Sequence, residues 1–169
     1  MTARLIHYSN KPLSEVRSAK QDVALARPDK PQGLWFSVGD GEDGWRAWCE
    51  GESFNIGGLV CATEIVLHPN AGILRVSTAE QIDELTARYG YDCDHMPPHL
   101  SYGRGYGINW KKIAERHDGI LIAPYVWERR LHRGTHWYYG WDCASGVIWN
   151  AQAVHELRAL EPVAAAATA

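Results

Sequence analysis

The stretch Arg4-Leu5-Ile6-His7-Tyr8-Ser9 decides how the start of this chain is interpreted. Isoleucine and tyrosine favour extended backbone, so residues 4–9 are predicted to form a β-strand. An imidazole beside a phenol is unusual in a core strand, and it indicates that something polar is held there. The alternative is a histidine whose ring is satisfied within the strand itself. His7 is therefore the first candidate for a binding role.

Two later segments combine aromatic and polar side chains in the same way. Gly33-Leu34-Trp35-Phe36-Ser37 introduces a second predicted strand, and Trp141-Asp142-Cys143-Ala144-Ser145-Gly146 follows much later. An ionised carboxylate among large aromatic rings is costly unless it is hydrogen-bonded. Asp142 therefore either caps the turn at residues 144–146 or holds a sugar hydroxyl and stabilises developing positive charge. Together the three segments indicate a pocket for a nucleotide-like ligand.

Composition bounds the class of protein. The chain has 169 residues, enough for one domain, predicted over residues 4–160 with a disordered alanine-rich tail at 161–169. Its 17 basic and 20 acidic residues give a net charge of −3. That balance argues against affinity through broad phosphate neutralisation but leaves room for a local basic groove. No apolar run could span a bilayer or serve as a signal peptide, so we expect a cytoplasmic protein without membrane contact.

The cysteine and aromatic residues are unevenly used. Cys49, Cys61, Cys93 and Cys143 are scattered without a Cys-x-x-Cys pair, which predicts reduced thiols rather than disulfides. Eight Trp and eight Tyr stand against two Phe. Trp and Tyr join an apolar body to a polar tip, so they suit pocket walls and interfaces as well as cores.

The order of the predicted elements mixes strands and helices without the regular alternation of a doubly wound sheet. We therefore expect a compact α+β domain with one or two small mixed or antiparallel sheets and short helices. The predicted strands cover residues 4–9, 34–38, 63–68, 73–76, 120–123, 136–142 and 146–149. The predicted helices lie near 13–16, after residue 43, and over 79–89, 110–117 and 151–160.

Three of these helices have a capping signal at their start. Asp43 is predicted as the N-cap of a short helix that carries Trp45. Ser77 and Glu80 have the spacing of a capping box. Asn109 can cap the helix that follows it.

Two local clusters offer weaker chemistry. Cys93, His95 and His99 are residue types that zinc accepts, but a structural site normally needs four well-spaced donors. The glycines of residues 103–107 could present backbone amides to a phosphate, although their spacing matches neither a Walker loop nor a dinucleotide fingerprint. No Gly-x-Ser-x-Gly occurs, and no cysteine has a local partner signature, so nucleophilic catalysis is not indicated. We predict no metal site, and a zinc protein is a third alternative.

Taken together, the segments resemble the ADP-ribosyltransferase superfamily, in the histidine-containing style of diphtheria toxin and the poly-ADP-ribose polymerases. The resemblance rests on chain order over residues 4–150. It comprises the strand with His7, the segment 33–37, the strands at 64–69 and 73–76, the segment 110–120 and a late carboxylate. The chain also resembles small uncharacterised proteins encoded by phages. That likeness implies a host cytoplasm and a host protein or nucleic acid as target.

The resemblance implies roles for single residues. The first-strand histidine of the family hydrogen-bonds the ribose of NAD, so His7 is expected to hold that ribose. Tyr8, Ser9 and Ser37 are then candidate contacts to NAD. Aromatic residues of the family stack on the nicotinamide ring, and the candidates here are Trp35, Trp45 and Tyr138.

The catalytic carboxylate of the family is a late glutamate that binds the ribose hydroxyl while the glycosidic bond breaks. Asp142 is the nearest equivalent in position, although it is one methylene shorter, and Glu64 and Glu128 are the alternatives. No Glu-x-Glu or Gln-x-Glu pair occurs in the final third, and no Ser-Thr-Ser lies on a predicted strand.

The function implied by the resemblance is NAD-dependent ADP-ribosyl transfer to an unknown acceptor, with Asp142 and His7 as catalytic residues and NAD as substrate. The alternative is a non-catalytic module with the same fold. Such a module would bind a nucleotide, a nucleic acid or a protein through its many Trp and Tyr side chains.

Overall fold

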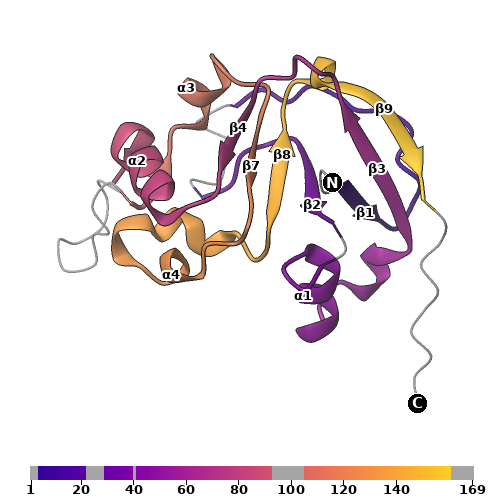
Figure 1. Cartoon of the computed structure of the whole chain (residues 1–169), viewed down its shortest axis with the longest axis horizontal. Coiled ribbons are helices and arrows are strands. Elements are labelled where there is room, and N and C mark those ends of the chain that lie inside the picture. The colour runs from indigo at the N-terminus through magenta and orange to yellow at the C-terminus, as the bar shows by residue number, and fades with distance from the viewer. Residues whose placement is uncertain (1–3, 22–28, 40, 93–104, 161–169) are drawn as a thin grey trace.

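A seven-stranded sheet organises the chain, and its strand order is β4-β7-β8-β2-β1-β3-β9 (Figure 1). The computed structural model describes residues 4–21, 29–39, 41–92 and 105–160. All neighbouring strands of this sheet run antiparallel except β4 and β7, which are parallel. Its strands are β1 (Leu5–Ser9), β2 (Leu34–Val38), β3 (Cys61–Leu67), β4 (Ile73–Val76), β7 (Gly119–Ile122), β8 (Ser145–Ile148) and β9 (Val154–Ala159). A second sheet pairs β5 (Gly90–Tyr91) with β6 (Gly107–Ile108).

The expected compact α+β architecture with mixed strands and short helices is confirmed, although the main sheet is larger than the small sheets predicted. The helices are α1 (Trp45–Gly51), α2 (Ala79–Tyr89), α3 (Trp110–Ala114) and α4 (Trp127–Arg130). The 3₁₀ segments are η1 (Ile56–Leu59), η3 (Arg133–Gly140) and η4 (Ala151–Ala153), and η3 consists of two helical segments joined by a kink at Thr135. No helix in the described ranges has both the length and the apolar character needed to cross a membrane.

One face of the sheet is covered by two separate groups of helices. Over β4, β7 and β8, the segments α2, α3 and η3 bury a large aromatic and aliphatic cluster that includes Ile120, Trp137 and Val147. Over β1 and β3, α1 and η1 bury a smaller cluster around Ile6 and Cys49. Figure 1 shows the two groups on either side of β8, with α1 next to β2. The sheet surface between the groups is the place where a site can form.

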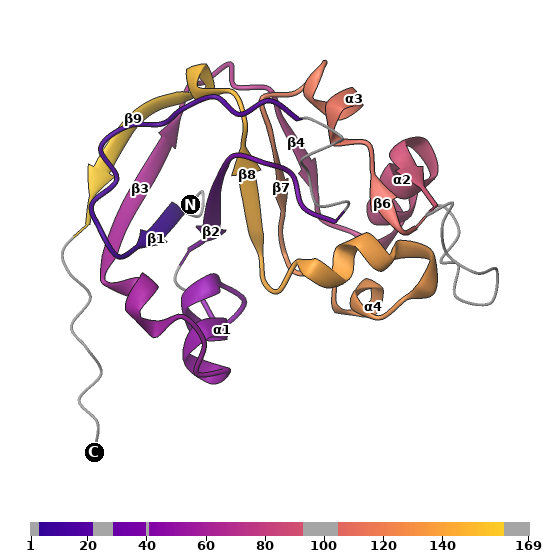
Figure 2. The same cartoon turned by 180° about the vertical axis from the view of Figure 1, so that it is seen from behind.

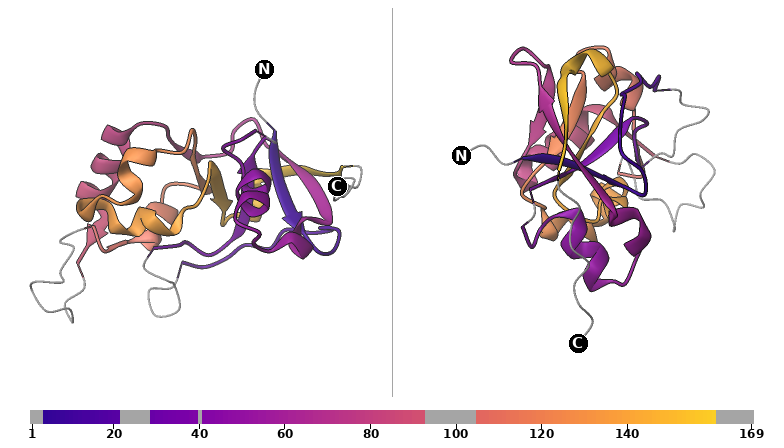
Figure 3. Two further views of the ribbon diagram at one scale, coloured as in Figure 1. Left: turned by 90° about the horizontal axis from the view of Figure 1, so that it is seen from below. Right: turned by 90° about the vertical axis from the view of Figure 1, so that its right-hand side faces the viewer.

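The opposite face holds a third cluster, built around Phe36, Ile65 and Leu121. Figure 2 shows β3 and β9 sweeping across one end of the sheet, and the right panel of Figure 3 shows strands crossing one another in projection. The segment before residue 21 is tied to the far end of the sheet, where the Ala19 amide donates to the carbonyl of Trp149.

Three predicted elements are wrong. Residues 136–142 are not a strand but belong largely to η3, where consecutive Trp137 and Tyr138 are both buried. Residues 151–160 form η4 and the edge strand β9 instead of a helix, because β9 pairs with β3 along its length. Residues 13–16 form no helix. In each case the local composition resembles one element while distant pairing or packing selects another.

Two capping predictions also need correction. The N-cap of α1 is Gly44, and the Asp43 carboxylate accepts instead from the Tyr125 amide at 2.6 Å. The cap of α2 is Thr78, whose hydroxyl accepts from the Gln81 amide, so the capping box lies one residue later than predicted. Gln81 reinforces this cap, because its side-chain oxygen accepts from the amide of Ser77, the residue before the cap, at 2.7 Å. The Asn109 cap of α3 is confirmed by its hydrogen bond from the Lys112 amide.

Candidate functional site

A cavity of about 310 Å³ opens between the two helix groups. It lies where the ladder between β1 and β2 stops, because these strands pair only at Leu5 with Val38 and at Ile6 with Ser37. Its volume falls at the lower end of the ~300–1,000 Å³ range of small-molecule pockets. Its described lining comes from four parts of the chain: Ile6, His7, Tyr8, Lys30, Trp35, Phe36, Ser37, Trp45, Asn55, Gly140, Trp141, Asp142, Cys143 and Ser145.

His7 bridges the two strands just beyond the last paired residues. Its Nδ1 lies 2.7 Å from the Trp35 carbonyl oxygen. A carbonyl only accepts, so Nδ1 carries the proton and, in the neutral ring, Nε2 is an acceptor. No described residue shares a hydrogen bond with Nε2. The strand contact thus fixes the ring and leaves one nitrogen for a ligand hydroxyl.

Ser37 lines the cavity, and its hydroxyl already takes part in a backbone hydrogen bond. Its side chain is only 2 % exposed, and its hydroxyl accepts from the Trp45 amide at 2.9 Å. Gly44 makes this approach possible, since a Cβ there would lie 3.0 Å from Ser37 Oγ. Ser37 therefore caps α1 from the sheet and positions Trp45 at the cavity. It orders the wall of the site rather than offering a free hydroxyl.

The cavity wall is largely aromatic. Trp35 and Trp141 contact one another with ring centroids 4.9 Å apart and planes tilted by 56°. On the α1 side, Trp45 stacks on Trp48 with centroids 5.1 Å apart. Rings arranged in this way provide planar apolar surfaces on which a heterocycle can stack.

A cation and a carboxylate face each other at the same cavity. Lys30 Nζ lies 5.3 Å from the Trp35 ring centroid and 4.0 Å from Asp142 Oδ2. The lysine is placed by its neighbour Asp29, whose carbonyl accepts from Trp141 Nε1 at 3.3 Å. Asp142 Oδ1 lies 3.6 Å from Arg130 Nη2. About a fifth of the Asp142 side chain is exposed, so solvent weakens both ion pairs.

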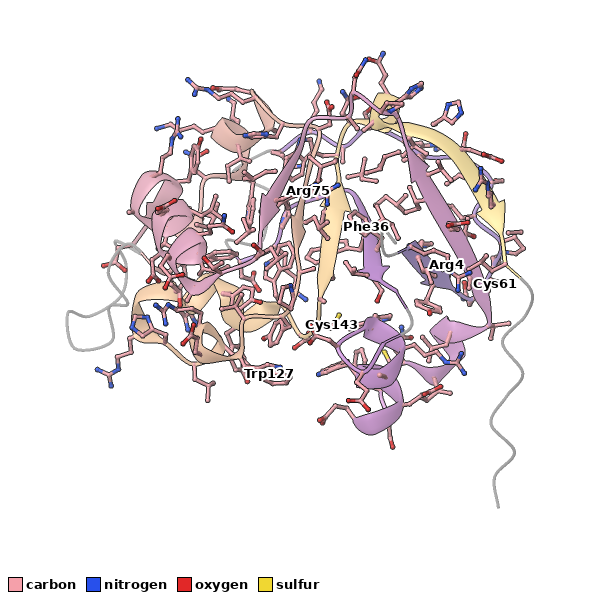
Figure 4. The ribbon with its side chains drawn as sticks, viewed as in Figure 1. Arg4, Phe36, Cys61, Arg75, Trp127 and Cys143 are labelled. Atoms are coloured by element: carbon pink, nitrogen blue, oxygen red, sulfur yellow. The ribbon has the colours of Figure 1, made fainter. Side chains whose placement is uncertain are left out.

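The thiols near the site are protonated at neutral pH. Burial raises the pKa of Cys143, which lines the cavity, to about 12, and the nearby Asp142 charge acts in the same direction. Burial likewise raises the pKa of Cys49 to about 11. Because the thiolate is the nucleophilic form, neither cysteine is suited to nucleophilic catalysis. Figure 4 shows Cys143 beside α1. Cys49, Cys61 and Cys143 are all free, as predicted.

Six of the predicted site residues line this one cavity, namely His7, Tyr8, Trp35, Ser37, Trp45 and Asp142. Two others lie elsewhere. The Ser9 hydroxyl donates to the Lys11 carbonyl at 2.6 Å, which closes a turn after β1. Tyr138 is fully buried in the core, and its hydroxyl accepts from the Val126 amide at 2.9 Å. Its ring stacks on Tyr125 and not on the cavity.

Neither alternative carboxylate is among the residues described as lining the cavity. Glu64 lies on β3 with Oε2 3.9 Å from Arg158 of β9, and Glu128 is exposed on α4. This leaves Asp142 as the cavity's carboxylate within the described chain. The sequence analysis did not identify Lys30 or Asn55 as site residues, because neither belongs to a motif or a periodic segment. It named Trp141 and Cys143 only as neighbours of Asp142.

The predicted zinc ligands Cys93, His95 and His99 lie outside the described residues, and so does part of the glycine cluster at 103–107. Within the described ranges, no group of three or more His, Cys, Asp or Glu side chains could hold a metal ion. No family model, curated protein or solved structure matches this chain.

Proposed function

We propose that the protein is an NAD-dependent ADP-ribosyltransferase whose active site is the cavity between β1 and β2. One observation carries the proposal: His7, Trp35 and Asp142, which come from the first strand, the second strand and a late turn, line a single cavity. These are the positions to which the family resemblance assigns the ribose contact, a stacking ring and the catalytic carboxylate.

The charges of the cavity suit the two halves of NAD. The nicotinamide ring is planar and cationic, and the wall offers the indoles of Trp35 and Trp141 beside the Asp142 carboxylate. The pyrophosphate is anionic, and Lys30 provides a positive charge at the same wall. His7 Nε2 can accept a hydrogen bond from a ribose hydroxyl because Nδ1 is committed to the Trp35 carbonyl.

In the proposed reaction the bond between ribose C1′ and the nicotinamide nitrogen breaks. The electron pair stays on that nitrogen, which loses its positive charge, and the ribose passes through an oxocarbenium-like state. The Asp142 carboxylate stabilises this positive charge electrostatically. An acceptor oxygen or nitrogen then bonds to C1′ and releases its proton to water. The free thiols at Cys49, Cys61 and Cys143 accord with a reducing compartment, and we place the reaction in the cytoplasm.

The test measures nicotinamide released from NAD by the wild type and by His7→Ala and Asp142→Asn. Loss of one such group is expected to lower the rate by about 10²–10³. His155→Ala and Glu156→Gln, both on the exposed edge strand β9, are the matched controls and should keep the wild-type rate. Equal turnover by the wild type and both cavity variants would refute the assignment.

A second candidate is a binding module that holds NAD or ADP-ribose without cleaving it. The contact of Asp142 with both Lys30 and Arg130 favours this reading, because a carboxylate engaged by two cations is less available to a ribose. Calorimetry with NAD separates the candidates. Binding without nicotinamide release would identify the module, and release would identify the enzyme.

A further inference from the structure

Tyr125 carries a buried hydroxyl whose proton has no acceptor. The residue follows β7 and is only 4 % exposed, and its hydroxyl has no hydrogen-bond partner in the described part of the chain. Burying a hydroxyl without a partner is costly, because water satisfies the same group in the unfolded chain. Buried polar groups are therefore nearly always paired, and an exception indicates a functional role or a partner that arrives later.

The Tyr125 side chain is held in place by its neighbours. Its ring stacks on Tyr138, with centroids 5.2 Å apart and planes 27° apart, and meets Trp127 edge to face at 4.8 Å. Its amide donates to the Asp43 carboxylate at 2.6 Å. Because both the ring and the backbone are fixed, the hydroxyl cannot turn toward another partner within the packed core. It keeps its position until an acceptor comes to it.

The hydroxyl lies beside the charged wall of the cavity. The Trp127 indole that contacts the Tyr125 ring also contacts the Arg130 guanidinium, 5.7 Å from the indole centroid. Arg130 Nη2 in turn lies 3.6 Å from Asp142 Oδ1. Figure 4 shows Trp127 and Cys143 at the same edge of the molecule. Burial raises the pKa of the Tyr125 phenol above its usual value, and the Arg130 and Asp142 charges act on it in opposite directions. The phenol is therefore protonated at neutral pH and can donate a hydrogen bond.

The missing acceptor can be identified from hydrogen-bonding capacity. An arginine guanidinium offers only donors, so Arg130 cannot take the phenolic proton. The Asp142 carboxylate offers acceptors. Its ion pairs, to Arg130 at 3.6 Å and to Lys30 at 4.0 Å, are longer than the ~2.7–2.9 Å of a direct charge-assisted hydrogen bond. Neither cation therefore holds the carboxylate through a direct hydrogen bond.

We propose that Tyr125 is a positioning residue whose hydroxyl donates to the Asp142 carboxylate once the ligand is bound. This role rests on the proposed function, in which Asp142 is the catalytic carboxylate. The pyrophosphate of NAD attracts Lys30 away from Asp142, and one carboxylate oxygen then turns to the Tyr125 hydroxyl while the other faces the ribose. A supporting residue whose own ring is locked by packing holds the reacting group in its productive geometry.

Two measurements compare Tyr125→Phe with the wild type. Because the substitution removes an unpaired hydroxyl, the variant should unfold at an equal or higher urea concentration. Tyr138→Phe is the matched control, because the Tyr138 hydroxyl accepts from the Val126 amide at 2.9 Å and its loss should lower the urea midpoint. In nicotinamide release from NAD, Tyr125→Phe should lower kcat by about 10- to 100-fold, as expected for a hydrogen bond to a charged group, and leave KM unchanged.

A double-mutant cycle with Asp142→Ala tests whether Tyr125 acts through Asp142. In the Asp142→Ala background, Tyr125→Phe should have no further effect on kcat. A lower urea midpoint of Tyr125→Phe, a wild-type kcat in that variant, or effects of the two substitutions that multiply would overturn this role and leave the proposed function in place. Wild-type turnover by Asp142→Ala, or no nicotinamide release by the wild type, would refute the proposed function and the role of Tyr125 with it.

Discussion

His7 Nδ1 lies 2.7 Å from the carbonyl oxygen of Trp35, immediately beyond the point where β1 and β2 stop pairing. The side chain thus takes the place of a ladder hydrogen bond and satisfies a carbonyl that the separating strands leave unpaired. This contact holds the strands at a fixed spacing while the cavity opens between them. His7 therefore has two separate roles: Nδ1 holds the strands together, and we propose that Nε2 binds the ligand.

Substitution of His7 should separate these two roles. His7→Ala removes both nitrogens and should lower the free energy of unfolding by about 1 kcal/mol, the net value of a typical hydrogen bond. His7→Asn keeps a donor near the Nδ1 position but loses the Nε2 acceptor. We expect the Asn variant to be more stable than the Ala variant in urea unfolding, yet equally poor in nicotinamide release. Wild-type release by His7→Asn would show that Nε2 has no role.

Ser37→Ala should weaken the start of α1. The substitution leaves the Trp45 amide without its acceptor, and loss of a helix cap costs about 1 kcal/mol. Because Trp45 lines the cavity, NAD affinity should fall together with stability. Thermal unfolding and calorimetry measure the two effects. Ser9→Ala is the control, since its hydroxyl only closes the turn to Lys11, and a loss of NAD affinity in that variant would contradict this account.

Gly146 marks the closest approach of β8 to its neighbours. A Cβ at this position would lie 2.3 Å from Phe36 Cζ and 2.4 Å from the Ile120 carbonyl oxygen. Backbone cannot yield as a flexible side chain does, so Gly146→Ala should cost about 1–3 kcal/mol or more in unfolding experiments. Gly57→Ala, with nothing within 4 Å, should change stability by no more than about 0.5 kcal/mol. Similar stabilities of the two variants would show that β2 and β8 can separate without cost.

The parts of the fold that were predictable have local signals. Strands β1 and β2 and helix α2 follow from side-chain type, spacing and caps within a few residues. The N-cap of α2, Thr78, lies one residue after the predicted cap, Ser77. By contrast, β9 exists because β3 offers it a partner about 90 residues earlier in the chain. The aromatic composition of η3 is typical of a strand. However, consecutive Trp137 and Tyr138 are both buried in the core, whereas successive side chains of a strand point to opposite faces.

The site shows the same division. The sequence could single out His7 and Asp142 because polar groups among apolar ones are conspicuous. It could not show that the Ser37 hydroxyl is used by an amide eight residues later, which removes Ser37 from the free polar contacts. Lys30 lies in a polar, proline-containing stretch without periodicity, and only the packing of Asp29 against Gly140 and Trp141 brings it to the cavity.

Alkaline pH should destabilise the fold through its buried thiols. Burial raises the pKa of Cys143 to about 12 and that of Cys49 to about 11, whereas the pKa of a thiol in the unfolded chain is about 8.5. A raised folded pKa means that the native state keeps a proton that the unfolded state releases. The stabilisation is therefore fully present below the unfolded pKa and is lost as the pH rises through the folded one.

Urea unfolding at a series of pH values from neutral to about pH 11 measures this loss. The free energy of unfolding of the wild type should fall above about pH 8.5, with each thiol contributing at most about 1.4 kcal/mol per pH unit. Cys143→Ala should show a shallower fall, because it removes the more strongly shifted group, while Cys61→Ala, on the half-buried start of β3, serves as the control. Parallel pH curves for the wild type and Cys143→Ala would mean that the Cys143 thiol titrates alike in both states, and that the cavity wall around it admits water.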